Sequence, residues 1–143
     1  MRIANWDIKL AEYIDGLRDM PFAWGSNDCI TFTNKSMQII TGKGYCDDWI
    51  GDYSNGRGAF KHYRRKLSEQ GYDGIIDALD NRLSRLDAKY PPRGTLIGRK
   101  SDDVNGVLPI ALGVVISDLA AFLIDDGLIL SPIDETDLFW SVD

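Results

Sequence analysis

The first part of the chain, residues 1–90, carries most of its apolar residues at steps of three and four, which is the spacing of an amphipathic helix. We expect four helices there, over residues 6–18, 28–41, 58–70 and 74–83. Asn5 suits the N-cap of the first helix and the polar stretch 26–28 suits that of the second, because short polar side chains accept hydrogen bonds from the first turn. Gly42 suits the left-handed position that ends a helix.

The second part, residues 91–143, carries short, β-branched-rich apolar runs separated by Asp, Asn, Gly and Pro, as strands and turns do. Strands are expected over residues 95–99, 109–117, 120–124, 127–131 and 138–142. Residues 110–116 are apolar almost throughout, which predicts a central strand covered on both faces. Asp125-Asp126-Gly127 predicts a hairpin turn. Helices followed by an antiparallel sheet of about five strands make one α+β domain over residues 1–143, mainly helical in 1–90 and a sheet in 91–143.

The charge balance and the hydrophobic content exclude several classes of protein. The 143 residues include 16 Lys and Arg and 22 Asp and Glu, a net charge of −6, whereas nucleic-acid-binding modules present a basic stripe or patch. A hydrophobic content of 44% excludes an intrinsically disordered chain. No apolar run approaches the roughly 20 residues of a membrane span, and residues 1–17 lack the pattern of a signal peptide. Two cysteines do not indicate a disulfide scaffold, so folding in a reducing cytosol is expected.

The segment 21–32 is the part of the sequence that points to chemistry. It is an aromatic, glycine-containing loop that delivers Cys29 into the first turn of the second predicted helix. A thiolate there faces unpaired backbone N–H groups and the positive end of the helix dipole. These conditions lower the pKa of a thiol and make a cysteine nucleophilic. The alternative, which the residues alone favour, is that Cys29 is a small buried apolar residue in a well-capped helix start.

The spacing Phe22-x-Trp24-Gly25-x-x-Asp28-Cys29-x-x-Phe32 resembles the nucleophile motif of the NlpC-like cell-wall cysteine peptidases. In that superfamily a Y-x-W/Y-G…D-C-S-G motif opens a helix packed on an antiparallel sheet. The closer resemblance is to a compact branch found in tailed phages, prophages and gene transfer agents. The resemblance implies a papain-like α+β domain with Cys29 in the place of the nucleophile. The positions that fit the pattern of this branch are Trp6, Phe22, Trp24, Gly25, Asp28, Cys29, Gly42, Gly71, Gly94, Ala111, Leu112, Gly113, Gly127 and Trp140.

The same resemblance identifies what this chain lacks. The general base of the superfamily is a histidine at the start of a central strand, where this chain has Ala111. The residue after the nucleophile is Ile30 rather than serine, and Thr95 stands where a Gly-Asp pair usually opens the first strand. The only histidine, His62, falls on the third predicted helix. Without an imidazole, Cys29 has no partner to take up its proton and return it to a leaving amine.

Two functions of different classes remain. The first, which the missing histidine favours, is a structural or assembly component of a phage tail tip or baseplate. Such a component is made in the host cytoplasm, is built into the virion, and binds other tail-tip or hub proteins. The alternative is an active cysteine peptidase or amidase that cuts peptidoglycan peptides during infection, with Cys29 as its nucleophile.

Candidate contact residues come from the motif and from two long predicted loops, 45–58 and 99–108, since long loops often carry binding sites. Trp49, Ile50 and Tyr53 suit interface anchors, with the alternative that they cover the core of the domain itself. A groove around Cys29, lined by aromatic residues, is the other candidate surface. The residues singled out for a groove or an interface are Trp24, Asp28, Trp49, Ile50, Tyr53 and Ala111.

No cofactor and no metal site is expected. Asp47, Asp48 and Asp52 lie close together in the sequence, but they lack the spacing of a calcium-binding EF-hand loop. A solvated acidic loop is the favoured interpretation of these residues. Cys46 belongs to no Cys/His cluster of the kind that binds zinc.

Overall fold

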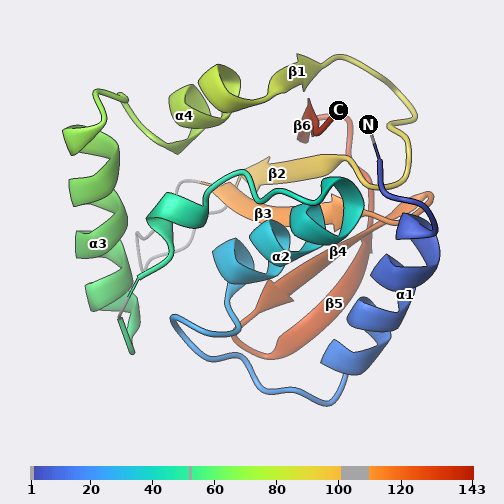
Figure 1. Cartoon of the computed structure of the whole chain (residues 1–143), viewed down its shortest axis with the longest axis horizontal. Helices are drawn as coiled ribbons and strands as arrows, with labels where there is room; N and C mark the ends of the chain where they lie inside the picture. The colour runs from blue at the N-terminus through green and yellow to red at the C-terminus, as the bar shows by residue number, and fades with distance from the viewer. Residues whose placement is uncertain (1, 52, 101–109) are drawn as a thin grey trace.

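Four α-helices and an antiparallel sheet of six strands make up the computed structural model, which describes residues 2–51, 53–100 and 110–143 (Figure 1). All four helices come before the strands in sequence, so the predicted α+β class is confirmed. Among the residues described, no helix is both long and apolar enough to cross a bilayer.

The four predicted helices are present, with ends within two residues of those expected. Asp28 is the N-cap of the second helix: its Oδ1 accepts a hydrogen bond from the Thr31 N–H at 2.9 Å, while the Thr31 hydroxyl accepts one from the Asp28 N–H at 2.8 Å. Gly42 ends this helix with a φ of 85°, as predicted. Asn5 precedes the first helix without a capping side-chain bond. The helices are α1 (Trp6–Leu17), α2 (Cys29–Thr41), α3 (Gly56–Glu69) and α4 (Ile75–Arg82), with a short 3-10 turn, η1 (Asp47–Trp49).

The sheet has the order β1-β6-β2-β3-β4-β5, so β3 lies in its interior and β1 and β5 lie at its edges. The prediction of about five strands, all after residue 90, is wrong by one. The additional strand, β1, has only three residues, too few to show an alternating pattern. The first residue of the predicted strand 109–117 lies outside the described residues. The strands are β1 (Ser84–Leu86), β2 (Leu96–Lys100), β3 (Ile110–Val115), β4 (Leu119–Ile124), β5 (Gly127–Pro132) and β6 (Leu138–Ser141).

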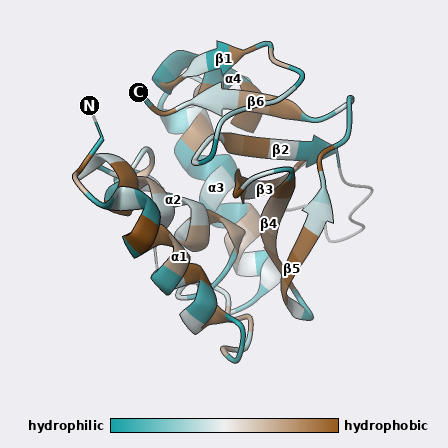
Figure 2. Ribbon diagram, turned by 90° about the vertical axis from the view of Figure 1, so that its right-hand side faces the viewer, coloured by the Kyte–Doolittle hydropathy of each residue, from teal (hydrophilic) through white to brown (hydrophobic). Residues whose placement is uncertain are grey.

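Apolar side chains are buried on both faces of the sheet. On one face, Leu112 and Val114 of β3 join the main cluster, to which α1 and α2 contribute residues such as Leu10 and Phe32. On the other face, Val115 of β3 packs in a smaller cluster with residues of β2, β4 and β6. Figure 2 shows the apolar stretches of β2 and β4 beside β3. The prediction that this strand is covered on both faces is therefore confirmed.

Arg82, at the end of α4, connects η1 to the ends of α3 and α4 through hydrogen bonds. Its guanidinium donates hydrogen bonds to both oxygens of Asp48, at 2.7 and 2.9 Å, and to Gln70 Oε1 at 2.9 Å. The same group lies 4.4 Å from the ring centre of Trp49. These hydrogen bonds from Arg82 lower the pKa of the Asp48 carboxyl to about 2. The arrangement holds Trp49 in the interior, against Gln70 at the end of α3 and Arg82 at the end of α4.

Candidate functional site

Cys29 is the first residue of α2 and lies beside the central strand β3. The capped turn formed by Asp28 and Thr31 fixes this helix start, so the predicted position of Cys29 in the helix is confirmed. The cysteine is half-buried and packs against the main apolar cluster, as does Trp24. The backbone N–H groups of Cys29 itself, of Ile30 and of Leu112 in β3 face the sulfur and favour its ionised form.

The thiol of Cys29 is nevertheless harder to ionise than an ordinary thiol. Burial raises its pKa, the adjacent Asp28 carboxylate raises it further, and together they outweigh the three backbone N–H groups, giving a pKa of about 12. The helix start lowers this pKa as expected, but burial outweighs it, so the thiol is not activated and the buried-residue alternative fits Cys29 better. At neutral pH the residue is therefore a thiol.

The Asp28 carboxylate acts as a structural lock. Besides capping α2, it accepts hydrogen bonds on Oδ2 from the Gly25 N–H at 2.8 Å and from the Tyr53 hydroxyl at 2.9 Å. Gly25 has a φ of 87°, and a Cβ there would collide with the carbonyl oxygen of Tyr53. The carboxylate is buried and fully occupied, so it joins segment 21–28 to the loop that carries Tyr53.

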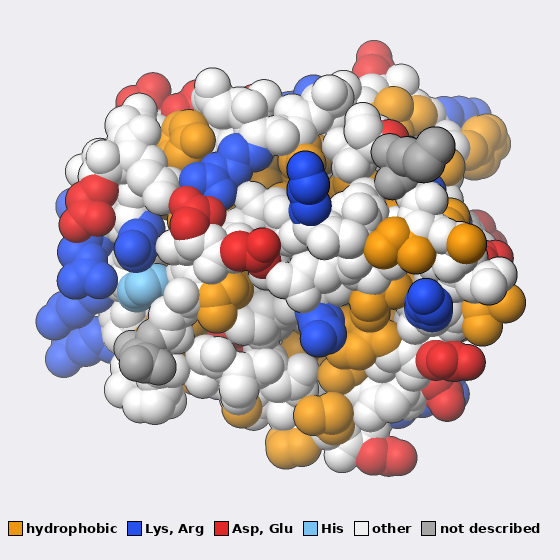
Figure 3. All heavy atoms as spheres, in the orientation of Figure 1, with side chains coloured by type: hydrophobic (Ala, Val, Ile, Leu, Met, Phe, Trp, Pro, Cys, Tyr) orange, Lys and Arg blue, Asp and Glu red, His pale blue; other side chains and the backbone are white. Residues whose placement is uncertain are grey.

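His62 belongs to a different group of side chains, in the middle of α3, and part of it reaches the surface (Figure 3, pale blue). Its ring lies 5.4 Å from that of Tyr53 and 5.3 Å from that of Tyr63. Its Nε2 is hydrogen-bonded to the carbonyl oxygen of Trp49, so this nitrogen carries a proton and donates. The hydroxyls of Tyr53 and Tyr63 are also hydrogen-bonded to each other, and burial raises the pKa of both well above the ordinary value. A histidine held in this way supports the packing of the loop before α3.

The residue in the place of the general base faces away from the nucleophile position. Ala111 is on β3, but its side chain packs in the smaller cluster, on the face opposite the main cluster that Cys29 contacts. Side chains alternate along a strand, so the neighbouring Leu112, and not Ala111, points toward the helices. The prediction that Cys29 lies close to the strand that carries Ala111 is confirmed, because the Leu112 backbone N–H faces the sulfur. Ala111 and Leu112 are both apolar, and neither can move a proton.

The predicted interface anchors divide into one core residue and two surface residues. Trp49 is 0% exposed and its Nε1 donates to Gln70 at 2.8 Å, so it is a core residue and not an exposed anchor. Ile50 is 37% exposed, and Tyr53 is half-buried. Trp24 packs edge-on against Phe22, with ring centres 4.8 Å apart. The predicted loop 99–108 lies mostly outside the described residues.

A shallow depression follows the motif on the protein surface. Its volume is about 390 Å³, and it is lined by Trp24, Gly25, Gly51, Tyr53 and Ser54. The depression lies beside the hydrogen bonds that Asp28 accepts from Gly25 and Tyr53, and not beside a cysteine–histidine pair. The sequence could not identify Tyr63 as a partner of Tyr53, because spacing along α3 predicts only that Tyr63 is buried.

The described residues contain no group of three His, Cys, Asp or Glu side chains close enough to bind a metal ion. Asp47 Oδ1 accepts hydrogen bonds from the amides of Asn34 at 2.7 Å and Gln38 at 2.8 Å. Asp48 is paired with Arg82. Cys46 is fully buried, and Asp52 lies outside the residues described.

Residues 1–142 match the model of a protein family described as "Domain of unknown function (DUF6950)". Searches of curated proteins and of solved structures each give no match. The match covers all but the last residue of the chain. The protein is therefore a member of the DUF6950 family.

Proposed function

We propose that this protein is a non-hydrolytic structural or assembly component of a phage tail tip or baseplate, built on a degenerate papain-like, NlpC-like fold. The observation that carries the proposal is the state of Cys29. It lies at the start of α2 beside the sheet, in the place that the resemblance gives to the nucleophile, but burial keeps its thiol protonated and the β3 residue whose backbone faces it is the apolar Leu112. The resemblance of segment 21–32 to the tail-associated branch of the superfamily supports the assignment to a tail tip.

Peptide hydrolysis by Cys29 would require a proton acceptor and later a donor for the leaving amine. General acid–base assistance contributes about 10²–10⁴ in rate. The Asp28 carboxylate is occupied by Thr31, Gly25 and Tyr53. His62 lies on α3 with its Nε2 on the Trp49 carbonyl, and among the described residues no hydrogen bond joins its ring to Cys29. These contacts support a Cys29 without acid–base assistance.

The residues of the motif also have structural roles that do not depend on catalysis. Asp28 caps α2 and holds Tyr53. Gly25 permits the close approach of the Tyr53 carbonyl. A sequence that has these structural residues but no general base is what we expect of a domain that functions through its surface and not through catalysis. On this proposal the protein is made in the host cytoplasm, enters the virion, and binds other tail-tip or hub proteins.

The experiment compares the purified protein with its Cys29→Ala variant on cell-wall muropeptides, and also asks whether the protein is part of purified virions. We expect equal, background-level cleavage by both proteins. We also expect the wild-type chain to co-purify with tail-tip or hub proteins encoded beside it, and to be present in virions.

Cleavage by the wild-type protein that disappears in Cys29→Ala would contradict the proposal and establish the peptidase alternative. A chain that stays monomeric with every neighbouring tail protein, and is absent from virions, would contradict the structural role.

A further inference from the structure

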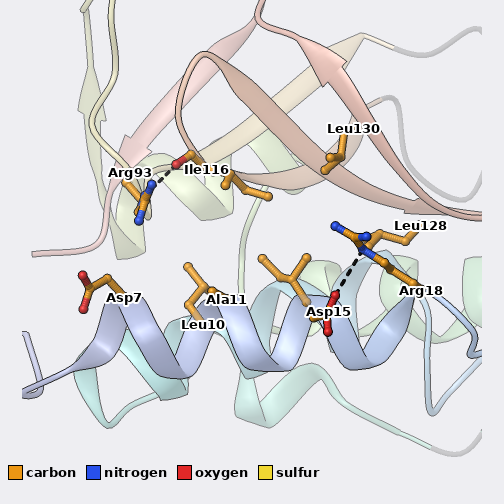
Figure 4. A pocket seen from close by; sticks show the side chains of 10 residues that line it. Asp7, Leu10, Ala11, Asp15, Arg18, Arg93, Ile116, Leu128 and Leu130 are labelled. Carbon is orange, nitrogen blue, oxygen red and sulfur yellow. Dashed lines mark hydrogen bonds and ion pairs between the residues drawn. The ribbon is translucent and has the colours of Figure 1, made fainter.

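The outer edge of β5 borders an apolar groove against α1, shown in Figure 4. β5 is the last strand of the sheet, and no other described strand pairs with its outer side. The groove has a volume of about 580 Å³. Its apolar lining comes from α1, from the residue after β3, and from β5: Leu10, Ala11, Ile14, Ile116, Leu128 and Leu130.

Backbone hydrogen-bonding groups at this edge are open in a regular pattern. β4 and β5 are joined by the two-residue turn Asp125-Asp126, and Ile124 pairs with Gly127 across it. Because the pair that closes such a turn is hydrogen-bonded and the pattern alternates, the N–H and C=O groups of Leu128 and Leu130 point outward. The side chains of the same two residues line the groove. One extended segment can therefore pair with the backbone here and place alternate side chains against α1.

The first part of β5, over Leu128–Leu130, lacks the charges that usually protect an edge strand. A charged side chain reaches only the far end of the strand, where Arg99 donates to Ser131 Oγ and to the Pro132 carbonyl, both at 2.7 Å. Leu130 is 49% exposed and Ile129 is 39% exposed, one on each face of the strand. Pro132, at the far end of β5, has no backbone N–H to donate, but it lies beyond the outward-pointing groups of Leu128 and Leu130.

Exposed acidic residues flank this uncharged strand at both ends. Asp125 and Asp126 precede it, and Asp134 and Glu135 follow it. Hydrogen bonds from the Thr136 N–H and hydroxyl lower the pKa of Asp134. The two arginines of the groove are already engaged, Arg18 with Asp15 at 3.4 Å and Arg93 with the carbonyl of Ile116 at 2.6 Å (Figure 4). The edge therefore suits a segment with cationic flanks.

A second copy of the chain fits this edge poorly because of the same charges. If β5 paired antiparallel with its own copy through Leu128 and Leu130, the Asp125-Asp126 turn of one chain would meet residues 132–134 of the other. Asp134 and Glu135 would then lie beside like charges, and juxtaposed like charges are unfavourable. The charges thus favour a different chain as the occupant.

We propose that β5 binds a partner protein by strand addition, taking an extended segment of alternating apolar residues with Lys or Arg at both ends. The segment runs antiparallel to β5, pairs with the backbone of Leu128 and Leu130, and buries alternate side chains in the groove beside α1. This inference rests on the proposed function, because it names the class of segment that an assembly partner would insert.

The test uses a fluorescent peptide of about ten residues in which Val and Thr alternate between terminal pairs of Lys. Binding to the full protein is followed by fluorescence anisotropy, beside a peptide with Glu in place of Lys. We expect saturable binding of the Lys peptide and binding of the Glu peptide at least about tenfold weaker. Leu130→Lys should weaken the Lys peptide at least about tenfold. Ile8→Lys, at a 56% exposed α1 residue outside the groove lining, should leave binding unchanged.

A second variant keeps the test decisive if Leu130→Lys disturbs the fold. Asp126→Lys combined with Glu135→Lys sets one Lys against the remaining acidic residue at each end of β5 and should abolish the preference between the two peptides. Equal binding of both peptides by the wild-type protein, no binding by it, or no effect of these variants would overturn the proposal. So would self-association of the protein that Leu130→Lys abolishes, since the occupant would then be a second copy.

The outcome is separable from that of the proposed function. If the protein does not cleave muropeptides and is present in virions but does not bind the peptide, only the strand-addition proposal is rejected. If it cleaves muropeptides, the proposed function is rejected whether or not the peptide binds.

Discussion

Replacing Trp49 with alanine is expected to lower the free energy of unfolding by about 3–5 kcal/mol. The indole is fully buried, and its Nε1–H is paired with Gln70. Arg82 stacks on its face while it holds Asp48. The variant therefore leaves a large cavity and removes the surface that positions the Arg82 guanidinium.

Ile50→Ala is the matched control, because the neighbouring side chain is 37% exposed and its loss should cost about 1 kcal/mol or less. Urea denaturation, with an unchanged slope, measures both values. If Trp49→Ala were no more destabilising than Ile50→Ala, Trp49 would be a surface anchor and not a core residue.

Asp28→Ala has the second largest expected effect, a loss of about 2–4 kcal/mol in the free energy of unfolding. The change removes the N-cap of α2, which contributes about 1 kcal/mol. It also leaves the Gly25 N–H and the Tyr53 hydroxyl without their acceptor, at about 1–3 kcal/mol for a buried donor.

Thr31→Val removes only the reciprocal half of the capping box and keeps the bond from the Thr31 N–H to Asp28 Oδ1. It removes the hydroxyl that accepts from the Asp28 N–H but leaves the bonds from Gly25 and Tyr53 to the carboxylate. We expect a loss of about 1 kcal/mol from this variant, measured by denaturation beside Asp28→Ala. Equal losses in the two variants would mean that Asp28 does not lock the Tyr53 loop.

The helices and their ends could be predicted because their signals are local. The polar stretch before Cys29 and Gly42 after Thr41 are cap residues by their own chemistry, and Asp125-Asp126-Gly127 is a turn by composition. β1 could not be found in the same way, because its three residues are a strand only through pairing with β6.

The candidate site depended on tertiary facts that spacing does not contain. A shift of one residue on β3 decides whether Ala111 or Leu112 faces α2. The pKa of Cys29 depends on burial under neighbouring elements, which outweighs the local influence of the helix start. A tryptophan suits an interface anchor and a core residue equally well. Only the burial of Trp49 and its packing with Arg82 show that it is a core residue.

The pH dependence of Cys29 alkylation tests the central claim, that this cysteine is an unassisted thiol, most directly. The rate with iodoacetamide is measured for the wild-type protein and for Cys29→Ala, in which only the fully buried Cys46 remains. With a pKa of about 12, the Cys29 rate should rise about tenfold per pH unit from about pH 6 to about pH 9, without a plateau, because only the thiolate reacts. A rate that is already high and constant across this range would reveal a thiolate held by a protonated base, and would contradict the account.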